Sequence, residues 1–192
     1  MVVMVLSDRD IKKAIKNGRI KITPKIDEKT QLGSCSVDLR LGNNFRIFNY
    51  SRYPYIDPFN KKYLQRISKE IKIKNHKPFV LQPNDFVLAT TIETLAISDD
   101  ILARLEGRSS LGRLGIIVHS TASIFDPGWR GKIVMELGNM GRMAVALHPG
   151  MRICALTFEQ LTSPVETPYY KKKSAKYVGQ KEPLASKIAE EK

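Results

Sequence analysis

The sequence predicts a mainly β fold, a compact sandwich or jelly roll, with a short helix near the N-terminus and few other short helices. Short runs of alternating or β-branched apolar residues recur along the chain, as is typical of strands that bury one face. Sequences rich in Gly, Pro, Asn and Asp separate these runs and predict turns. With 192 residues, 42% of them hydrophobic, the chain is long enough for one domain with a sizeable core.

The predicted helix covers residues 7–18. Ser7 and Asp10 resemble a capping box at its start, and Gly18 is a typical residue for its end. Ile11, Ala14 and Ile15 form an apolar stripe at helical spacing.

Five later segments have the pattern of strands, and four sequences between or beside them are typical of turns. The strands are expected at residues 37–41, 86–91, 116–118, 133–137 and 153–158. The turns are expected at 41–44, 82–85, 126–128 and 148–150. Residues 51–78 are polar, basic and irregular, which indicates a surface excursion, and the polar, tyrosine-containing segment 169–180 precedes a short helical tail.

The formal net charge of +13 is concentrated in the first part of the chain. Residues 1–75 contain 17 Lys and Arg against 7 Asp and Glu, a balance of +10. A solvated basic surface and a footprint on a phosphate backbone both fit this distribution. No helix-turn-helix pattern, RNP-type aromatic motif or zinc finger accompanies the charge, so nucleic acid is not the expected main partner.

Other bulk features favour a cytoplasmic protein. No run approaches the roughly 18 to 20 apolar residues of a membrane span, and the N-terminus lacks the basic region of a signal peptide. Cys35 and Cys154 match no metal spacing and are expected to be free, buried thiols in a reducing compartment. His76, His119 and His148 likewise have no ligand-like spacing.

Residues 107–115, which we name the Ser/Arg loop, place two serines and two arginines around a turn of small residues. A helix with Ser109 or Ser110 as N-cap could begin there, with Arg113 one turn further on. Backbone N–H groups, hydroxyls and guanidinium groups at one point suit a polyphosphate. A capped surface helix with exposed arginines explains the same residues.

Residues 124–137 predict a turn followed by a strand that carries a single carboxylate, Glu136. The Asp126-Pro127-Gly128 sequence is typical of a structural turn without further function. Alternation along the strand could place Glu136 in solvent, whereas in a cleft it would be desolvated and suited to proton transfer. The lysines 171–173 fit a solvated face or a tail that folds over a triphosphate.

Together several segments resemble the dCTP deaminase family, whose relatives include the dUTPases. The matching segments are residues 7–11, 36–42, 107–115, 126–129 with Gly131, 134–136, 148–151, and 175–177 with Gln180. The resemblance implies one domain over residues 1–192 with a distorted jelly-roll or β-clip fold, and a tail, 165–192, over the active site. It also implies a homotrimer with shared sites, Mg²⁺ on the substrate triphosphate and feedback inhibition by dTTP.

The resemblance further implies that water replaces the 4-amino group of dCTP, giving dUTP and ammonia. Glu136 would then be the general base, Ser109 and the backbone of Ala122 would hold the water, and Arg113 would orient Glu136. Because the H-x-E and P-C-x-x-C ligands of zinc deaminases are absent from the sequence, water activation by the carboxylate without zinc is expected.

The implied substrate contacts extend over the Ser/Arg loop, the turn, the strand and the tail. Phosphates would be bound by Arg108, Ser110, Tyr169, Lys176 and Gln180, with Leu111 and Gly112 in the same loop. Asp126 would meet the deoxyribose hydroxyl, Trp129 would stack under the sugar, and backbone groups near Val134 and Met135 would read the pyrimidine edge.

Other functions fit parts of the same sequence pattern. A dUTPase shares the Asp-containing turn, although its tail is expected to be Gly-rich, whereas residues 165–192 contain only Gly179. A bifunctional enzyme that converts dCTP to dUMP, and a basic nucleic-acid-binding β domain, also fit parts of the pattern. Residues 122–125 depart from the more polar loop of some relatives, with an effect that the sequence does not define.

Overall fold

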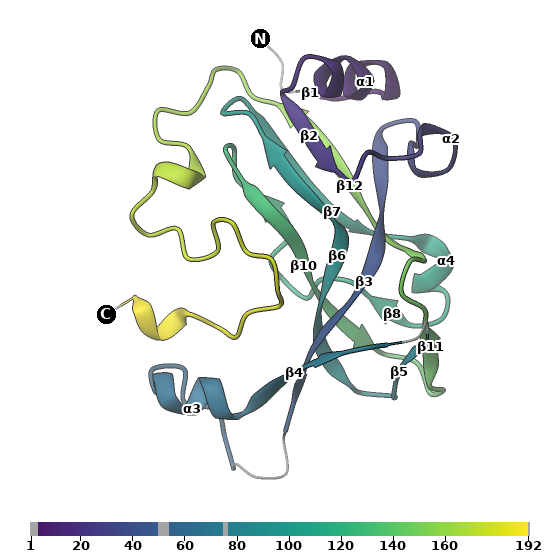
Figure 1. Ribbon diagram of the computed structural model, residues 1–192, viewed down its shortest axis with the longest axis vertical. Helices are drawn as coiled ribbons and strands as arrows, with labels where there is room; N and C mark the ends of the chain where they lie inside the picture. The colour runs from purple at the N-terminus through teal and green to yellow at the C-terminus, as the bar shows by residue number, and fades with distance from the viewer. Residues whose placement is uncertain (1–3, 50–53, 75–76, 192) are drawn as a thin grey trace.

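In the computed structural model, which describes residues 4–49, 54–74 and 77–191, β-strands dominate (Figure 1). The strands are β1 (Met4–Val5), β2 (Ile20–Thr23), β3 (Ser36–Phe48), β4 (Ser68–Lys72), β5 (Phe79–Leu81), β6 (Phe86–Ile97), β7 (Ile101–Gly107), β8 (Ile116–Ile117), β9 (Ile124–Phe125), β10 (Arg130–Asn139), β11 (Val145–Leu147) and β12 (Arg152–Gln160). The helices are α1 (Asp8–Lys16), α2 (Glu28–Gln31), α3 (Lys61–Arg66), α4 (Ser109–Gly112), and the short 3₁₀ turns η2 (Tyr169–Lys171) and η3 (Ile188–Glu190). The mainly β prediction is therefore confirmed.

Ten strands form one curled sheet, and the long strand β3 connects its two halves. The central order is β8-β10-β6-β3-β12-β7-β9, with β1 on β12, β2 on β6 and β4 on β3. The first part of β3 pairs with β12, and the part after Leu41 pairs with β6 and β4. A register shift between Leu41 and Phe45 separates the two parts, and such irregularities let a sheet bend.

The apolar alternation that predicts the strands is the alternation that fills the core. On β10, Ile133, Met135 and Leu137 are fully buried while Val134 and Glu136 are half-buried. Fully burying a side chain of this size contributes about 1.5 to 3 kcal/mol, so the periodic residues determine which face of each strand points inward. All five predicted strands are confirmed, and most extend by several residues beyond the predicted ends.

The N-terminal helix is confirmed together with its predicted ends. The Ser7 hydroxyl accepts a hydrogen bond from the Asp10 amide at 3.4 Å and donates one to the Asp10 carboxylate at 2.8 Å. Ile11 and Ala14 are buried, and Gly18 has a φ of +72°, which suits the left-handed turn after a helix.

Three sequence-based predictions about the fold are wrong in the described residues. The turn expected at 41–44 lies within β3, where a register shift in the pairing with β6, rather than a turn, accommodates these residues. Residues 61–72, expected within an irregular surface excursion, form α3 and β4, because β4 can pair with the edge of β3. Cys35 is exposed rather than buried, since it lies in the turn closed by the Gly33 amide on the Ser36 carbonyl, outside the strand alternation. Cys154 is buried as predicted, and desolvation raises the pKa of its thiol. His76 lies outside the described residues.

Candidate active site

The Ser/Arg loop begins where β7 ends at Gly107, and its central part forms the single turn α4. The predicted serine N-cap is wrong. Arg108 occupies the cap position with extended backbone, and no side chain caps the helix. The backbone stays extended through Arg108, and the turn begins at Ser109, one residue earlier than a cap at Ser109 would place it. Ser109 and Ser110 are therefore exposed first-turn residues whose hydroxyls do not cap α4.

Two hydrogen-bonding groups fix the guanidinium of Arg108. Its Nε lies 3.1 Å from the Asp38 carboxylate on β3, and its Nη1 donates to the Arg152 carbonyl on β12 at 3.1 Å. Arg152 also contacts the same Asp38 oxygen through its Nη1 at 3.2 Å. No local pattern in the sequence indicates a role for Asp38 or Arg152, since strands far apart in sequence bring them together.

Glu136 is half-buried, and backbone amides orient its carboxylate. Its Oε2 accepts hydrogen bonds from the amides of Ser120 at 2.8 Å and Thr121 at 3.4 Å, the second a long one. Its own amide donates to the Val118 carbonyl at 3.0 Å. Of the two sequence-based alternatives, free exposure to solvent does not describe this carboxylate. The segment that leads to Ala122 holds it.

Val118 lies next to both Glu136 and Gly107, the first residue of the Ser/Arg loop. A Cβ placed on Gly107 would lie 3.9 Å from the Val118 side chain, while the Val118 carbonyl binds the Glu136 amide. Ala122 is exposed beyond Thr121, and Arg113 is exposed after α4. Among the described residues no hydrogen bond or ion pair joins Arg113 to Glu136, so the predicted orienting contact is not formed within one chain.

The predicted turn before β10 is confirmed. The Trp129 amide donates to the Asp126 carbonyl at 3.0 Å, and Gly128 has a φ of +82°, which a turn with Pro127 in its second position requires at its third. The Asp126 carboxylate lies 3.0 Å from Nζ of Lys172 in the tail. The turn therefore presents its acidic residue to the C-terminal segment.

Residues 179 and 180 of the described tail, 165–191, contact the side of β10 that faces away from β6. The Lys132 amide donates to the Gln180 carbonyl at 2.9 Å, and the Gly179 amide donates to the Arg130 carbonyl at 2.7 Å. At Gly131 a Cβ would stand 3.1 Å from backbone atoms of Gln180, so this glycine permits the close approach. Figure 1 shows this yellow-green segment at the left of the view and α4 at the right.

Val134 lies between these tail contacts and Glu136 on the same edge. Backbone groups alternate sides along a strand, and the amides of Lys132 and Glu136 both point away from β6. The N–H and C=O groups of Val134 therefore point to that side as well. Met135 is fully buried, so its side chain faces the core.

The predicted phosphate and sugar contacts of the tail and turn have intramolecular partners in the single chain. Trp129 is 6% exposed and packs between Phe125 and Tyr169, at ring distances of 4.9 and 5.2 Å. Its predicted stacking on a sugar stays a prediction. Lys176 pairs with Glu191, whose hydrogen bond raises the pKa of the lysine.

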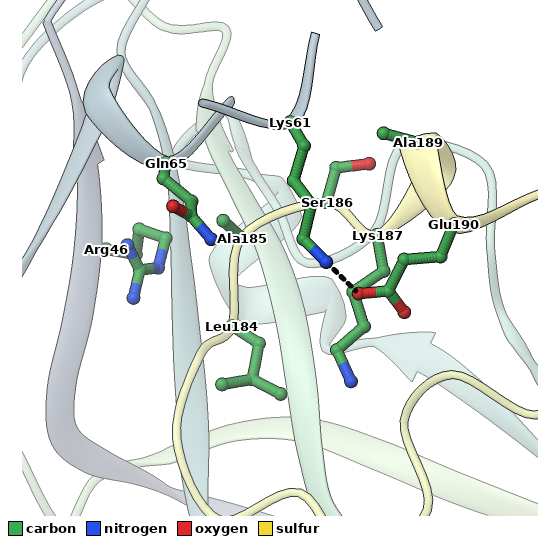
Figure 2. Close-up of a pocket in the computed structure, with 9 residues that line it drawn as sticks. All are labelled: Arg46, Lys61, Gln65, Leu184, Ala185, Ser186, Lys187, Ala189 and Glu190. Atoms are coloured by element: carbon green, nitrogen blue, oxygen red, sulfur yellow. Dashed lines mark ion pairs between the residues drawn. The ribbon is translucent and has the colours of Figure 1, made fainter. Parts of the chain in front are cut away.

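A cavity of about 250 Å³ lies elsewhere, between α3 and the end of the tail (Figure 2). Its lining cations already have partners: Lys61 pairs with Glu190 at 3.5 Å, Lys187 donates to the Lys176 carbonyl at 2.6 Å, and Arg46 donates to the Pro183 carbonyl. We interpret this cavity as a gap where the tail rests on α3, because its cationic groups already have partners within the chain.

Two further findings concern metal-binding groups and membrane-spanning helices. Among the described residues, no three His, Cys, Asp or Glu side chains gather closely enough to hold a metal ion. Within the same residues, no helix is long and apolar enough to cross a membrane.

Comparison with known proteins agrees with the resemblance. A model of the dCTP deaminase-like family matches residues 5–161. The dCTP deaminase of Thermomicrobium roseum is 56% identical over 188 residues, which cover 98% of this chain and 95% of that protein. A protein of Dictyoglomus thermophilum named "dCTP deaminase, dUMP-forming" is 54% identical over 185 residues, with 96% and 95% covered.

The fold has a solved counterpart as well. The crystal structure of 2'-deoxycytidine 5'-triphosphate deaminase from Agrobacterium tumefaciens superimposes with a TM-score of 0.65 at 22% identity. The match covers 83% of this chain and 47% of that longer one, and supports the shared fold. From the family match over most of its length and its high identity to curated relatives, we conclude that the chain belongs to the dCTP deaminase-like family.

Proposed function

We propose that this protein catalyses the hydrolytic deamination of dCTP to dUTP and ammonia. The observation that carries the proposal is the carboxylate of Glu136, which backbone amides hold half-buried on β10, next to the outward backbone groups of Val134. The family membership and the 56% identity to a protein named dCTP deaminase support the substrate class. A fixed carboxylate beside an open strand edge is suited to activate a water next to a bound pyrimidine.

Glu136 would act as both base and acid. Both amide bonds are to Oε2, so Oε1 is the oxygen that takes a proton from the attacking water. As the hydroxide adds to C4 of the cytosine, Glu136 delivers this proton to the ring nitrogen N3. Glu136 then carries the proton of the new C4 hydroxyl to the 4-amino group, so that C4=O forms, the C4–N4 bond breaks and ammonia leaves. Ser109 and the Ala122 backbone would hold the water, and Arg113 would stabilise the developing charge.

The substrate would lie along the open edge of β10. The outward N–H and C=O groups of Val134 would pair with the pyrimidine edge, as an added strand pairs with a sheet. Asp126 would bind the deoxyribose hydroxyl after Lys172 releases it. The phosphates would meet the remaining polar groups, which are Arg108, Ser110, Tyr169, Lys176 and Gln180.

A site shared between subunits accounts for a contact that the single chain does not form. Helix α4, which Arg113 follows, and the tail lie on different sides of the view, with β10, the strand of Glu136, between them (Figure 1). We therefore propose a homotrimer in which the Ser/Arg loop of one subunit completes the site on β10 of its neighbour. We further propose a cytoplasmic enzyme and inhibition by dTTP at the substrate site.

The residues present fit Mg²⁺ as an ion that the substrate brings. The described chain offers Arg108, Lys176 and hydroxyl groups for the triphosphate rather than a cluster of carboxylates for a metal. When bound, Mg²⁺ would neutralise part of the triphosphate charge. These side chains would bind and orient the phosphate oxygens that it leaves free.

A second outcome, release of dUMP and pyrophosphate, is favoured by one observation. The relative from Dictyoglomus thermophilum, 54% identical over 96% of this chain, is named as dUMP-forming. Such an enzyme would need a second water directed at the α-phosphate. The identity of the product therefore has to be measured.

One assay separates these functions. Purified protein is incubated with dCTP and Mg²⁺ while ammonia, dUTP, dUMP and pyrophosphate are followed over time. We expect ammonia with dUTP. Ammonia with dUMP and pyrophosphate would establish the second outcome, and pyrophosphate from dUTP without ammonia from dCTP would establish a dUTPase instead.

A further inference from the structure

The two ion pairs at Asp38 suggest a role that goes beyond the contacts proposed for the substrate. One oxygen, Oδ2 of Asp38, lies 3.1 Å from Nε of Arg108 and 3.2 Å from Nη1 of Arg152. The side chains of Asp38 and Arg108 are 18% and 25% exposed, so water screens this pair less than a fully exposed one. One carboxylate thus holds two guanidinium groups at the beginning of the Ser/Arg loop.

Sheet register explains how these residues meet. Strand β12 lies between β3 and β7, with Ala155 opposite Asp38 on one side and opposite Glu106 on the other. Residues directly opposite in a sheet share a face, and Arg108 lies two residues after Glu106, on the same face. The side chain of Arg108 therefore crosses β12, spanning two strand spacings of about 4.8 Å each, to reach Asp38.

We propose that Asp38 is a positioning residue that holds the guanidinium of Arg108 ready for the substrate triphosphate. This inference rests on the proposed function, which assigns Arg108 to the phosphates. The Arg152 carbonyl accepts a hydrogen bond from Nη1 of Arg108, and Asp38 forms an ion pair at its Nε, so these contacts lie at two of the five N–H donors of Arg108. Among the described residues no other group engages this guanidinium, so three donors remain for phosphate oxygens.

Charge explains why a carboxylate is needed at this position. The three side chains together carry a net charge of +1, which still attracts a polyphosphate. Without Asp38, the guanidinium groups of Arg108 and Arg152 would repel each other, and Arg108 would have to be ordered when the substrate binds. Losing this preorganisation weakens binding without changing the chemistry at Glu136.

The test measures phosphate binding separately from catalysis. Mg²⁺-tripolyphosphate is titrated calorimetrically into the wild type, Asp38→Asn, Arg108→Ala and the double variant, and KM and kcat for dCTP are measured in parallel. We expect Asp38→Asn to weaken tripolyphosphate binding and raise KM by roughly fivefold to tenfold, with kcat little changed. In the Arg108→Ala background the Asp38 substitution should have no further effect, because Asp38 acts through Arg108.

A matched control lies on the same strands. Glu159 on β12 pairs with Arg104 on β7 at 2.5 Å, on the face that carries Arg108. Glu159→Gln removes a comparable ion pair away from the Ser/Arg loop and should leave tripolyphosphate binding unchanged. Asp38→Glu, which retains the charge, should recover most of the binding.

Arg108→Lys tests the same contact from the other partner. Lysine keeps the charge, but its single ammonium lacks the separate nitrogens with which the guanidinium contacts both Asp38 and the Arg152 carbonyl. We therefore expect roughly tenfold weaker tripolyphosphate binding. Wild-type affinity in Arg108→Lys, or an undiminished Asp38→Asn effect in the Arg108→Ala background, would overturn the positioning role.

The wild type separates this inference from the proposed reaction. If it binds tripolyphosphate through Arg108 and Asp38 but releases no ammonia from dCTP, the reaction is wrong and the positioning role stands. If it releases ammonia while Asp38→Asn keeps wild-type affinity and KM, the positioning role alone is wrong. A wild type that does not bind tripolyphosphate also counts against Asp38.

Discussion

The two regions that carry the proposed phosphate contacts are held in different ways. The Ser/Arg loop follows β7, which is hydrogen-bonded to β12 and, through it, to β3, and an ion pair with Asp38 fixes its first arginine. The tail beyond residue 165 joins no strand and is held by backbone bonds at Gly179 and Gln180, aromatic contacts and partly exposed ion pairs. Segments with so few buried contacts open at lower free energy than a sheet. We infer that the sheet, with Glu136 on β10 and Arg108 after β7, supplies the chemistry and a preformed phosphate contact, and that the tail completes substrate capture.

The largest effect is expected for Glu136→Gln. The amide keeps the size of the side chain and can still accept from Ser120, but it cannot take a proton. We expect kcat to fall by roughly 10² to 10⁴-fold, with KM for dCTP little changed. Glu106→Gln, at an exposed glutamate of β7, is the control. Full turnover in Glu136→Gln would remove this residue from the mechanism, and a change confined to KM would reverse the division between the two regions.

Gly131→Ala should disturb the tail and spare the chemistry. The added Cβ would lie 3.1 Å from the amide nitrogen and carbonyl oxygen of Gln180, which would push the tail away from β10. We expect KM to rise by roughly tenfold, since the contacts at Lys176 and Gln180 are displaced, with a smaller change in kcat.

Gly150→Ala is the control for this substitution. Gly150 also has a positive φ, +91°, but an added Cβ there would meet no atom within 4 Å, and the residue lies in the turn before β12. The alanine would introduce backbone strain without a contact to the tail, so the KM of this variant should equal that of the wild type. If both alanine variants raise KM equally, strain rather than tail displacement is the cause.

Features that depend on neighbours in sequence are predicted correctly, whereas contacts between distant strands are not. Periodic burial predicts all five of the strands expected from the sequence, and local turn chemistry predicts the Asp126–Trp129 turn, because both depend on neighbours in sequence. The contacts of Arg108 with Asp38 and the Arg152 carbonyl depend on the pairing of β3, β12 and β7, which local patterns do not define. The serine cap is wrong because the extended backbone of β7 continues to Arg108, so the turn starts at Ser109.

The position of Glu136 shows a second limit of sequence patterns. Alternation correctly places it on the face opposite Ile133, Met135 and Leu137, but alternation cannot tell solvent from a site. The amides of Ser120 and Thr121 decide this, and they follow from the path of a loop rather than from a periodic pattern. The family resemblance implies a catalytic role for Glu136, which stays a prediction, and the structure supplies the physical reason for the orientation of its carboxylate.

Asp100 tests whether the segment where β12 ends and the tail begins is as stable as the sheet. Its carboxylate accepts from Ser98 and Arg19 at 2.5 Å each, and its carbonyl binds the Leu161 amide where β12 ends. Burial raises the pKa of Asp100, but the hydrogen bonds to Ser98, Gln160 and Arg19 with the charge of Arg19 outweigh it, so the pKa is lowered. A lowered pKa in the folded state means stability that is present above the unfolded value and lost as the pH falls through the folded one.

We therefore expect Asp100→Asn to lower the free energy of unfolding by about 1 kcal/mol at neutral pH. The difference from the wild type should shrink below about pH 4, the ordinary pKa of aspartate, as Asp100 becomes protonated. Urea unfolding followed by circular dichroism at several pH values measures it. An equal difference at pH 7 and at the lowest pH measured would mean that the ionised form of Asp100 contributes nothing to the free energy of unfolding.

The smallest effect is expected at the exposed contact between the tail and the turn. The Lys172 and Asp126 side chains are each 42% exposed and 3.0 Å apart, and such surface pairs contribute roughly 0.2 to 1 kcal/mol. Lys172→Ala should therefore speed limited proteolysis of the tail by less than about fivefold, with cleavage in the sheet unchanged. Because salt screens exposed charges, the difference from the wild type should disappear near 1 M NaCl. A difference that persists at high salt would show that the Lys172 stem, packed rather than charged, holds the tail closed.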